Sequence, residues 1–94
     1  MSEAELDELK KWLGYDSETG FVLWLQRPRY TTLAVGSRAG VVNSKGYRQV
    51  KLHRRVYLEH RLAWFLAHGK WPDLGIDHID GDKTNNKLAN LRLA

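Results

Sequence analysis

The chain has 94 residues, no cysteine and a net charge of +4. This length suits one small domain with a modest core, so we treat residues 1–94 as a single domain. The lack of cysteine excludes disulfides and thiolate zinc sites, and it fits a reducing cytoplasm. No apolar run approaches the length of a membrane span, and the acidic N-terminus is unlike a signal peptide.

The charge is unevenly distributed along the chain. Residues 1–13 carry four acidic and two basic side chains, so residues 14–94 carry 13 basic and seven acidic ones. A basic body favours a polyanionic partner, most simply nucleic acid. A basic protein with no such partner fits the charge alone equally well.

The first predicted element is an amphipathic helix over residues 3–13. Ser2 and Glu5 form a capping-box pattern at its start, leucines recur at helical spacing, and Gly14 is a natural stop. Its outer face is acidic, so we expect this helix to cover the sheet and not to contact DNA.

Short strands follow, alternating with turns rich in glycine, asparagine and aspartate. The pattern of period two is clearest over residues 47–53, which place Arg48, Val50 and Leu52 on one face. A turn is predicted at Arg54 and Arg55. The predicted strands span residues 21–25, 38–42, 47–53 and 56–59.

Basic side chains are concentrated on this small sheet, on the loop at 26–32 and in the C-terminal loop. They are candidates for contacts to a nucleic-acid backbone, and Tyr30 could stack on a base. Any one of them could equally be an ordinary solvated residue. The candidates are Arg27, Arg29, Arg48, Lys51, Arg54, Arg55, Lys83 and Lys87.

A core helix is predicted over residues 60–68, with apolar residues on one face and Gly69 as its stop. It begins with His60. We divide the chain into the N-terminal helix (1–13), the basic sheet and core helix (14–70), and a C-terminal hairpin (76–94).

The C-terminal hairpin holds the candidate chemistry. Asp77 and His78 lie between two apolar residues, turn formers follow, and Asn90 lies in the returning segment. A carboxylate oxygen is a hard ligand suited to Mg²⁺ or Mn²⁺, and a neutral histidine can remove a proton from water. A carboxylate, an imidazole and an amide held together suit metal-assisted hydrolysis of a phosphodiester.

This hairpin resembles the HNH endonuclease family, in particular its phage and homing-type members. The resemblance rests on DHIDGDKTNNKLANLR at residues 77–92. It extends upstream to Gly46-Tyr47, to HRLAW at 60–64 with His68-Gly69, and to a weaker echo at 15–24, YDSETGFVLW.

The resemblance implies roles for the matching residues. His78 would be the general base, Asp77 a metal ligand, and Asn90 the residue that steadies the hairpin and the histidine. His60 and Asn86 would be supporting residues, with His60 facing the cleavage site; a histidine that only hydrogen-bonds locally is the alternative for His60.

In the family, a final helix carries a further metal ligand. This chain ends at Ala94, so that ligand is missing, is supplied by another residue, or was removed.

The expected fold is therefore α+β: an N-terminal helix, a small antiparallel sheet, a core helix, and a ββα-metal-type hairpin without its last helix. The expected function is metal-dependent cleavage of double-stranded DNA in the cytoplasm of a bacterial or phage-infected cell, with Mg²⁺ or Mn²⁺. The alternative is a non-cleaving basic DNA-binding module or a catalytically incomplete HNH fragment. A third hypothesis is a zinc-stabilised domain using His60, His78 and a carboxylate.

Overall fold

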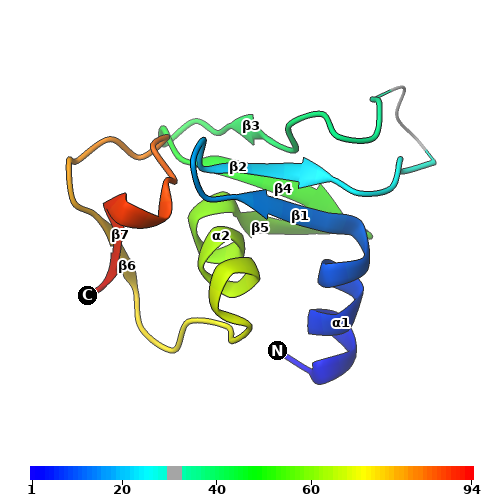
Figure 1. The fold of residues 1–94 in the computed structure, drawn as a ribbon, viewed down its shortest axis with the longest axis horizontal. Coiled ribbons are helices and arrows are strands. Elements are labelled where there is room, and N and C mark those ends of the chain that lie inside the picture. The colour runs from blue at the N-terminus through cyan, green and yellow to red at the C-terminus, as the bar shows by residue number, and fades with distance from the viewer. Residues whose placement is uncertain (30–32) are drawn as a thin grey trace.

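The N-terminal helix lies at one end of the fold (Figure 1). The computed structural model describes residues 1–29 and 33–94, so the proposed stacking residue Tyr30 lies outside the described residues. Helix α1 spans Glu3–Trp12, and the Ser2 hydroxyl accepts the Glu5 backbone N–H at 3.2 Å. The predicted helix and its cap are confirmed.

Strand β1 (Leu13–Asp16) was not predicted. It continues directly from α1 and pairs antiparallel with β2 (Phe21–Trp24), in the register Leu13↔Trp24 and Asp16↔Phe21. The helix ends at Trp12, before the predicted stop at Gly14, and Gly14 lies within the extended backbone of β1. The turn comes later, at 17–20.

The central sheet is antiparallel, in the order β3-β4-β5. Its strands are β3 (Val41–Val42), β4 (Arg48–Leu52) and β5 (Arg55–Leu58). Three predicted strands are confirmed; β3 and β4 are shorter than predicted, and β5 begins and ends one residue earlier. The turn between β4 and β5 lies at His53 and Arg54, one residue earlier than predicted, and both residues have positive φ (51° and 66°). Two consecutive positive φ values match the twist of a tight hairpin.

Helix α2 (Glu59–His68) is the central element. It packs against β1, β2, β4, β5 and the C-terminal hairpin, and it buries Leu62, Ala63 and Phe65. The helix ends at Gly69, whose φ is +78°. Trp71 packs against the core.

One prediction about the central sheet was wrong. Arg48 was expected to be available for contact with a nucleic-acid backbone, but only 12% of its side chain is exposed. It turns inward because its guanidinium pairs with the fully buried carboxylate of Glu59. Val50 and Leu52, which share its face of the strand, are buried.

The C-terminal hairpin consists of β6 (Ile76–His78), the short 3₁₀ helix η1 (Leu88–Asn90) and β7 (Leu91–Leu93). β6 and β7 are antiparallel, with Asp77 opposite Arg92. The hairpin and α1 lie at opposite ends of the molecule, with α2 between them (Figure 1). No helix within the described residues is long and apolar enough to cross a membrane.

Candidate active site

His78 lies at the end of β6 with one ring nitrogen facing inward. Its Nε2 is 2.7 Å from the side-chain oxygen of Asn86, and the residue is 8% exposed. Its Nδ1 makes no hydrogen bond within residues 1–29 and 33–94. The fully buried side-chain nitrogens without a partner in this part of the chain are Trp24 Nε1, Arg38 Nε and His60 Nδ1, so His78 Nδ1 is not fully buried. His78 Nδ1 is therefore in contact with solvent.

Asn86 is almost fully buried, at 1% exposure, behind His78. Its side-chain nitrogen donates to Glu59 Oε1 at 3.3 Å. Its backbone carbonyl accepts the Tyr15 hydroxyl at 2.5 Å. Burial raises the pKa of Tyr15 to about 12, and the negative charges of Glu59 and Asp16 act in the same direction. Tyr15 therefore stays protonated and remains a donor to Asn86.

The turn after β1 also packs closely against the backbone of Asn86 and Lys87. Gly20 has a φ of +78°, and a Cβ at this position would lie 2.4 Å from Lys87 N and 2.6 Å from the Asn86 carbonyl carbon. The sequence echo over residues 15–24 is therefore part of the site, because its Tyr15 and Gly20 together position Asn86.

Glu59 is the residue that sequence reasoning missed. Its carboxylate is 0% exposed and accepts from Arg48 Nε at 2.7 Å and from Arg38 Nη2 at 3.0 Å. A buried charge needs such partners, since desolvation of an unpaired carboxylate is very costly. The available signal was an acidic residue directly before the helix that carries the predicted apolar face.

Asn90 ties the two ends of the hairpin loop together. Its side-chain oxygen accepts the Asp80 backbone N–H at 3.0 Å, and its side-chain nitrogen donates to Asp80 Oδ1 and to the Asn85 carbonyl, each at 2.9 Å. The pKa of Asp80 is lowered by hydrogen bonds from the Asn85 side chain, the Asp82 backbone and the Asn90 side chain. Asn90 lies where it can hold the loop, as the resemblance implied, and within the described residues its side chain makes no hydrogen bond to the His78 ring.

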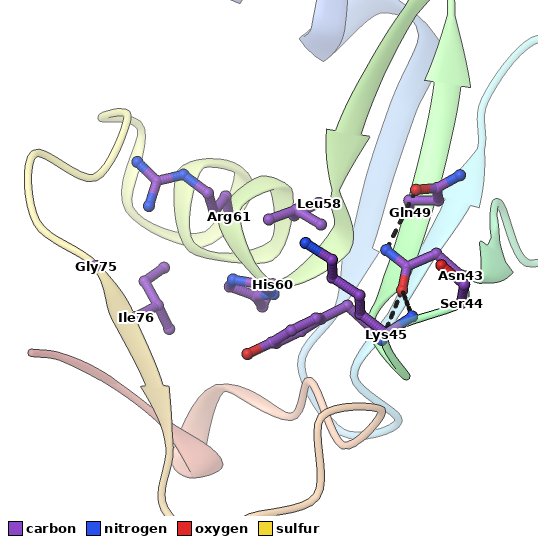
Figure 2. Close-up of a pocket in the computed structure, with 10 residues that line it drawn as sticks. Asn43, Ser44, Lys45, Gln49, Leu58, His60, Arg61, Gly75 and Ile76 are labelled. Atoms are coloured by element: carbon purple, nitrogen blue, oxygen red, sulfur yellow. Dashed lines mark hydrogen bonds between the residues drawn. The ribbon is translucent and has the colours of Figure 1, made fainter.

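His60 faces His78 directly. Their ring centroids are 5.0 Å apart in an edge-to-face arrangement, and the ring of Tyr47 is 5.5 Å from that of His60. Burial, then the charges of His78 and Arg61, lower the pKa of His60 to about 4, so it is neutral at pH 7. Figure 2 shows His60 at the start of α2, between the Lys45 turn and Ile76, lining an open groove.

Asp77 is exposed and paired with Arg92. The carboxylate oxygen Oδ2 accepts from Arg92 Nε at 3.0 Å and from Nη2 at 2.9 Å, and the other oxygen has no hydrogen-bond partner among the described residues. Within this part of the chain, no three His, Cys, Asp or Glu side chains are arranged to hold a metal ion. The described residues therefore give no support to a zinc site built from His60, His78 and a carboxylate.

Magnesium sites make weaker demands on the protein. Mg²⁺ keeps several water ligands and often takes one or two carboxylates plus substrate phosphates. The exposed Asp77 carboxylate fits such an ion as a single protein ligand, and Mn²⁺ shares this preference for oxygen.

The basic candidates fall into separate groups. Lys83 and Lys87 lie exposed on the hairpin loop, and Lys83 donates to the Lys45 carbonyl at 3.1 Å with its ammonium 4.7 Å from the Tyr47 ring centroid. Arg55 instead pairs with Glu5 of α1, and Arg54 precedes it in the turn.

Arg29 lines a hollow with Trp12 and His53, so it too lies toward α1, away from His78. Arg27 and Lys51 are exposed, whereas Arg48 is committed to Glu59. Of the predicted basic residues, Lys83 and Lys87 thus lie on the hairpin loop, and Arg48 is linked to the site through Glu59.

Known proteins resemble this chain in both sequence and fold. Residues 57–94 match a family model described as HNH endonuclease. The chain is 30% identical over 96 residues to YosQ of Bacillus subtilis (strain 168), an SPbeta prophage-derived protein named as an HNH homing endonuclease; the match covers 99% of this chain and 51% of YosQ.

The fold is similar to a solved structure of the HNH homing endonuclease I-HmuI, described for its DNA binding and cleavage. The TM-score is 0.61 at 23% sequence identity, over 88% of this chain and 46% of that chain. This chain spans about half the length of each of these relatives. The resemblance predicted from the hairpin motif is confirmed: residues 57–94 match the HNH endonuclease family, and the fold is similar to that of an HNH homing endonuclease.

Proposed function

We propose that this chain is a DNA endonuclease that hydrolyses phosphodiester bonds, with His78 as the general base. The observation that carries this proposal is the setting of His78, which is held from behind by buried Asn86 while Nδ1 contacts solvent. A base needs both a fixed ring and an accessible lone pair. The family match over residues 57–94 supports the same assignment.

The proposed reaction is attack by water on phosphorus. His78 Nδ1 takes a proton from the water, the water oxygen bonds to phosphorus, and the bond from phosphorus to the 3′ oxygen breaks. The departing 3′ oxygen takes a proton from solvent. The products are a 5′-phosphate and a 3′-hydroxyl, and the histidine returns its proton to water.

HNH nucleases generally use divalent metal ions. When bound, such an ion stabilises negative charge on the phosphate and on the departing oxygen. We propose Mg²⁺ or Mn²⁺ for this chain, with Asp77 as its protein ligand. The support is the exposure of the Asp77 carboxylate, at 45%, and its one unpaired oxygen.

Double-stranded DNA is the proposed partner, and the cytoplasm of a bacterial or phage-infected cell is the proposed place of action. Lys83 and Lys87 are the proposed backbone contacts at the site, because they are exposed beside the hairpin. Such contacts give affinity and salt dependence with little sequence preference.

A non-cleaving DNA-binding module is the second candidate. Two observations favour it: no three-residue metal cluster exists in the described part of the chain, and Arg92 neutralises the Asp77 carboxylate. This candidate predicts salt-sensitive binding of DNA that is indifferent to substitution of Asp77 or His78.

The deciding experiment is conversion of supercoiled plasmid by the 94-residue chain, with Mg²⁺, with Mn²⁺ and with chelator. His78→Ala is compared with His68→Ala, which removes an exposed histidine from the end of α2. Metal-dependent nicking that is lost only in His78→Ala supports the endonuclease. Binding without nicking in all versions supports the DNA-binding module.

A further inference from the structure

We propose that Glu59 and Asn86 are positioning residues that hold the hydrogen of neutral His78 on Nε2, which makes Nδ1 the nitrogen that accepts the proton from water. This inference rests on the proposed function, because it specifies how the general base of that site is prepared.

The first step is the orientation of the Asn86 amide. An ionised carboxylate can only accept hydrogen bonds, and Glu59 forms ion pairs with two arginines, Arg38 and Arg48. The nitrogen end of the Asn86 amide must therefore face Glu59, as it does at 3.3 Å. The reversed amide would place two acceptor oxygens against each other inside the protein.

The second step is the state of the imidazole. With its nitrogen directed at Glu59, Asn86 presents only its oxygen to His78, at 2.7 Å. An amide oxygen cannot donate, so His78 Nε2 must carry the hydrogen. The lone pair of the neutral ring is then on Nδ1, the nitrogen that contacts solvent.

The third step is the rigidity of this chain of contacts. Glu59 is 0% exposed and Asn86 1% exposed, so water does not compete for their hydrogen bonds. An unmatched hydrogen-bonding group in such a place costs far more than one at the surface.

Each member of the chain of contacts is also held from another part of the fold. Arg38 approaches Glu59 from the loop before β3 and lies over the Phe21 ring, with its guanidinium carbon 3.7 Å from the ring centroid. Arg48 is anchored by the carbonyls of Ala39 and Gly40 at 3.2 and 3.0 Å. Arginines from the central sheet and the loop before it thus determine, through Glu59 and Asn86, which ring nitrogen of His78 carries the hydrogen.

The test is ¹⁵N NMR of the His78 ring in the metal-free 94-residue chain, above the pH at which the ring is protonated. We expect a pyrrole-type Nε2 with an observable, slowly exchanging N–H, and a pyridine-type Nδ1. The Nε2–H form should dominate by at least about tenfold. In the other form, the Nε2 lone pair would face the Asn86 oxygen, and two buried acceptors would share no hydrogen. A major Nδ1–H form, or two forms of about equal population, would overturn the proposal.

Glu59→Gln tests the distant end of the chain of contacts. A glutamine can direct its amide nitrogen at Asn86, which lets the Asn86 amide reverse and present its own nitrogen to His78. We expect the Nε2–H preference to fall by about tenfold or to invert. A ring spectrum identical to the native one would show that Glu59 has no such role.

Asn86→Ala serves if Glu59→Gln does not fold. It leaves Glu59 and both arginines in place but removes the oxygen that accepts from His78 Nε2. The Nε2–H signal should therefore be lost to fast exchange with water, and its persistence would overturn the proposal. His68→Ala is the control, because it removes the exposed histidine at the other end of α2 and leaves the side chains of Glu59 and Asn86 unchanged. The ring spectrum of this control should stay native.

Plasmid cleavage by the same variants separates this inference from the proposed function. Glu59→Gln should lower the cleavage rate at saturating DNA by about tenfold or more and leave DNA affinity unchanged. Native-type NMR signals in a chain that never cleaves DNA would refute the endonuclease while leaving the proton on Nε2.

Discussion

Asp77 and Arg92 face each other across the β6–β7 pair, and both hydrogen bonds from the guanidinium end on the same carboxylate oxygen. Both side chains are largely exposed, Arg92 at 63% and Asp77 at 45%. Exposed ion pairs of this kind contribute at most about 1 kcal/mol to stability. The pair therefore matters more for the chemistry of Asp77 than for the fold.

Asp77→Asn should abolish metal-dependent nicking and change the free energy of unfolding by less than about 1 kcal/mol. Arg92→Gln, the matched partner, should cost equally little and retain nicking at a lower Mg²⁺ concentration, because it releases the carboxylate. Nicking rates across a Mg²⁺ titration check both. Equal inactivity of the two variants would contradict the role given to Asp77.

Gly20→Ala should strongly destabilise the site loop. The new Cβ meets backbone atoms of Asn86 and Lys87, and the backbone there has a positive φ. Gly36→Ala is the control, since Gly36 also has a positive φ (+89°) but no atom within 4 Å of an added Cβ. We expect a loss of about 1 kcal/mol for Gly36→Ala and about 1–3 kcal/mol more for Gly20→Ala, measured by urea unfolding. Equal losses of stability in the two variants would show that the backbone at Asn86 and Lys87 moves away from the new Cβ at little cost.

His60 should make the protein less stable as the pH falls from about 6.5 to about 4. The pKa of His60 is about 4 in the folded chain and near 6.5 in the unfolded chain. As the pH falls, the unfolded chain therefore binds the proton first, and the unfolded state is stabilised relative to the folded state. We expect a loss on the order of 2 kcal/mol that His60→Leu does not show. Urea unfolding at pH 7 and pH 4.5 checks this, and parallel pH profiles for the two proteins would contradict it.

Asn90→Ala should cost about 2–4 kcal/mol, because three side-chain hydrogen bonds of the hairpin loop are lost. The pKa of Asp80 should rise toward its ordinary value, followed by ¹³C NMR of the carboxyl group. Asn43→Ala, which breaks similar side-chain bonds to the backbone of Lys45 and Tyr47, is the control. It should destabilise the protein and leave the Asp80 titration unchanged; a shifted Asp80 titration in this control would contradict the local assignment.

Lys87→Ala should affect DNA binding, whereas Arg48→Ala should affect stability. Lys87 is exposed beside the hairpin, so its loss should reduce the salt dependence of DNA binding by about one phosphate contact, with the fold intact. Arg48→Ala leaves the carboxylate of Glu59 without one of its two arginines and should cost about 3 kcal/mol of stability. Salt titrations of DNA affinity and urea unfolding separate the two effects. A native-like stability of Arg48→Ala would mean that Arg38 alone suffices for Glu59.

The elements and the family could be predicted because their signals are local. The cap at Ser2, the alternation over 47–53, the apolar face of α2 and the motif at 77–92 are each set by neighbours in the chain. β1 was missed because its four residues, Leu13–Asp16, gain their extended form from pairing with β2 and show no clear alternation of their own.

The sequence by itself determined the α+β fold, the hairpin and the identity of His78, Asp77 and Asn90 as candidate residues. Only the tertiary structure decided what surrounds them. It placed Glu59 and Asn86 behind His78, turned Arg48 inward, and set Tyr15 and Gly20 against the site loop. Glu59 lies 27 positions from Asn86 and Tyr15 lies 71 positions from it. Contacts at such separations depend on how α2 packs between the sheets and the hairpin, and no pattern among neighbouring residues encodes that packing.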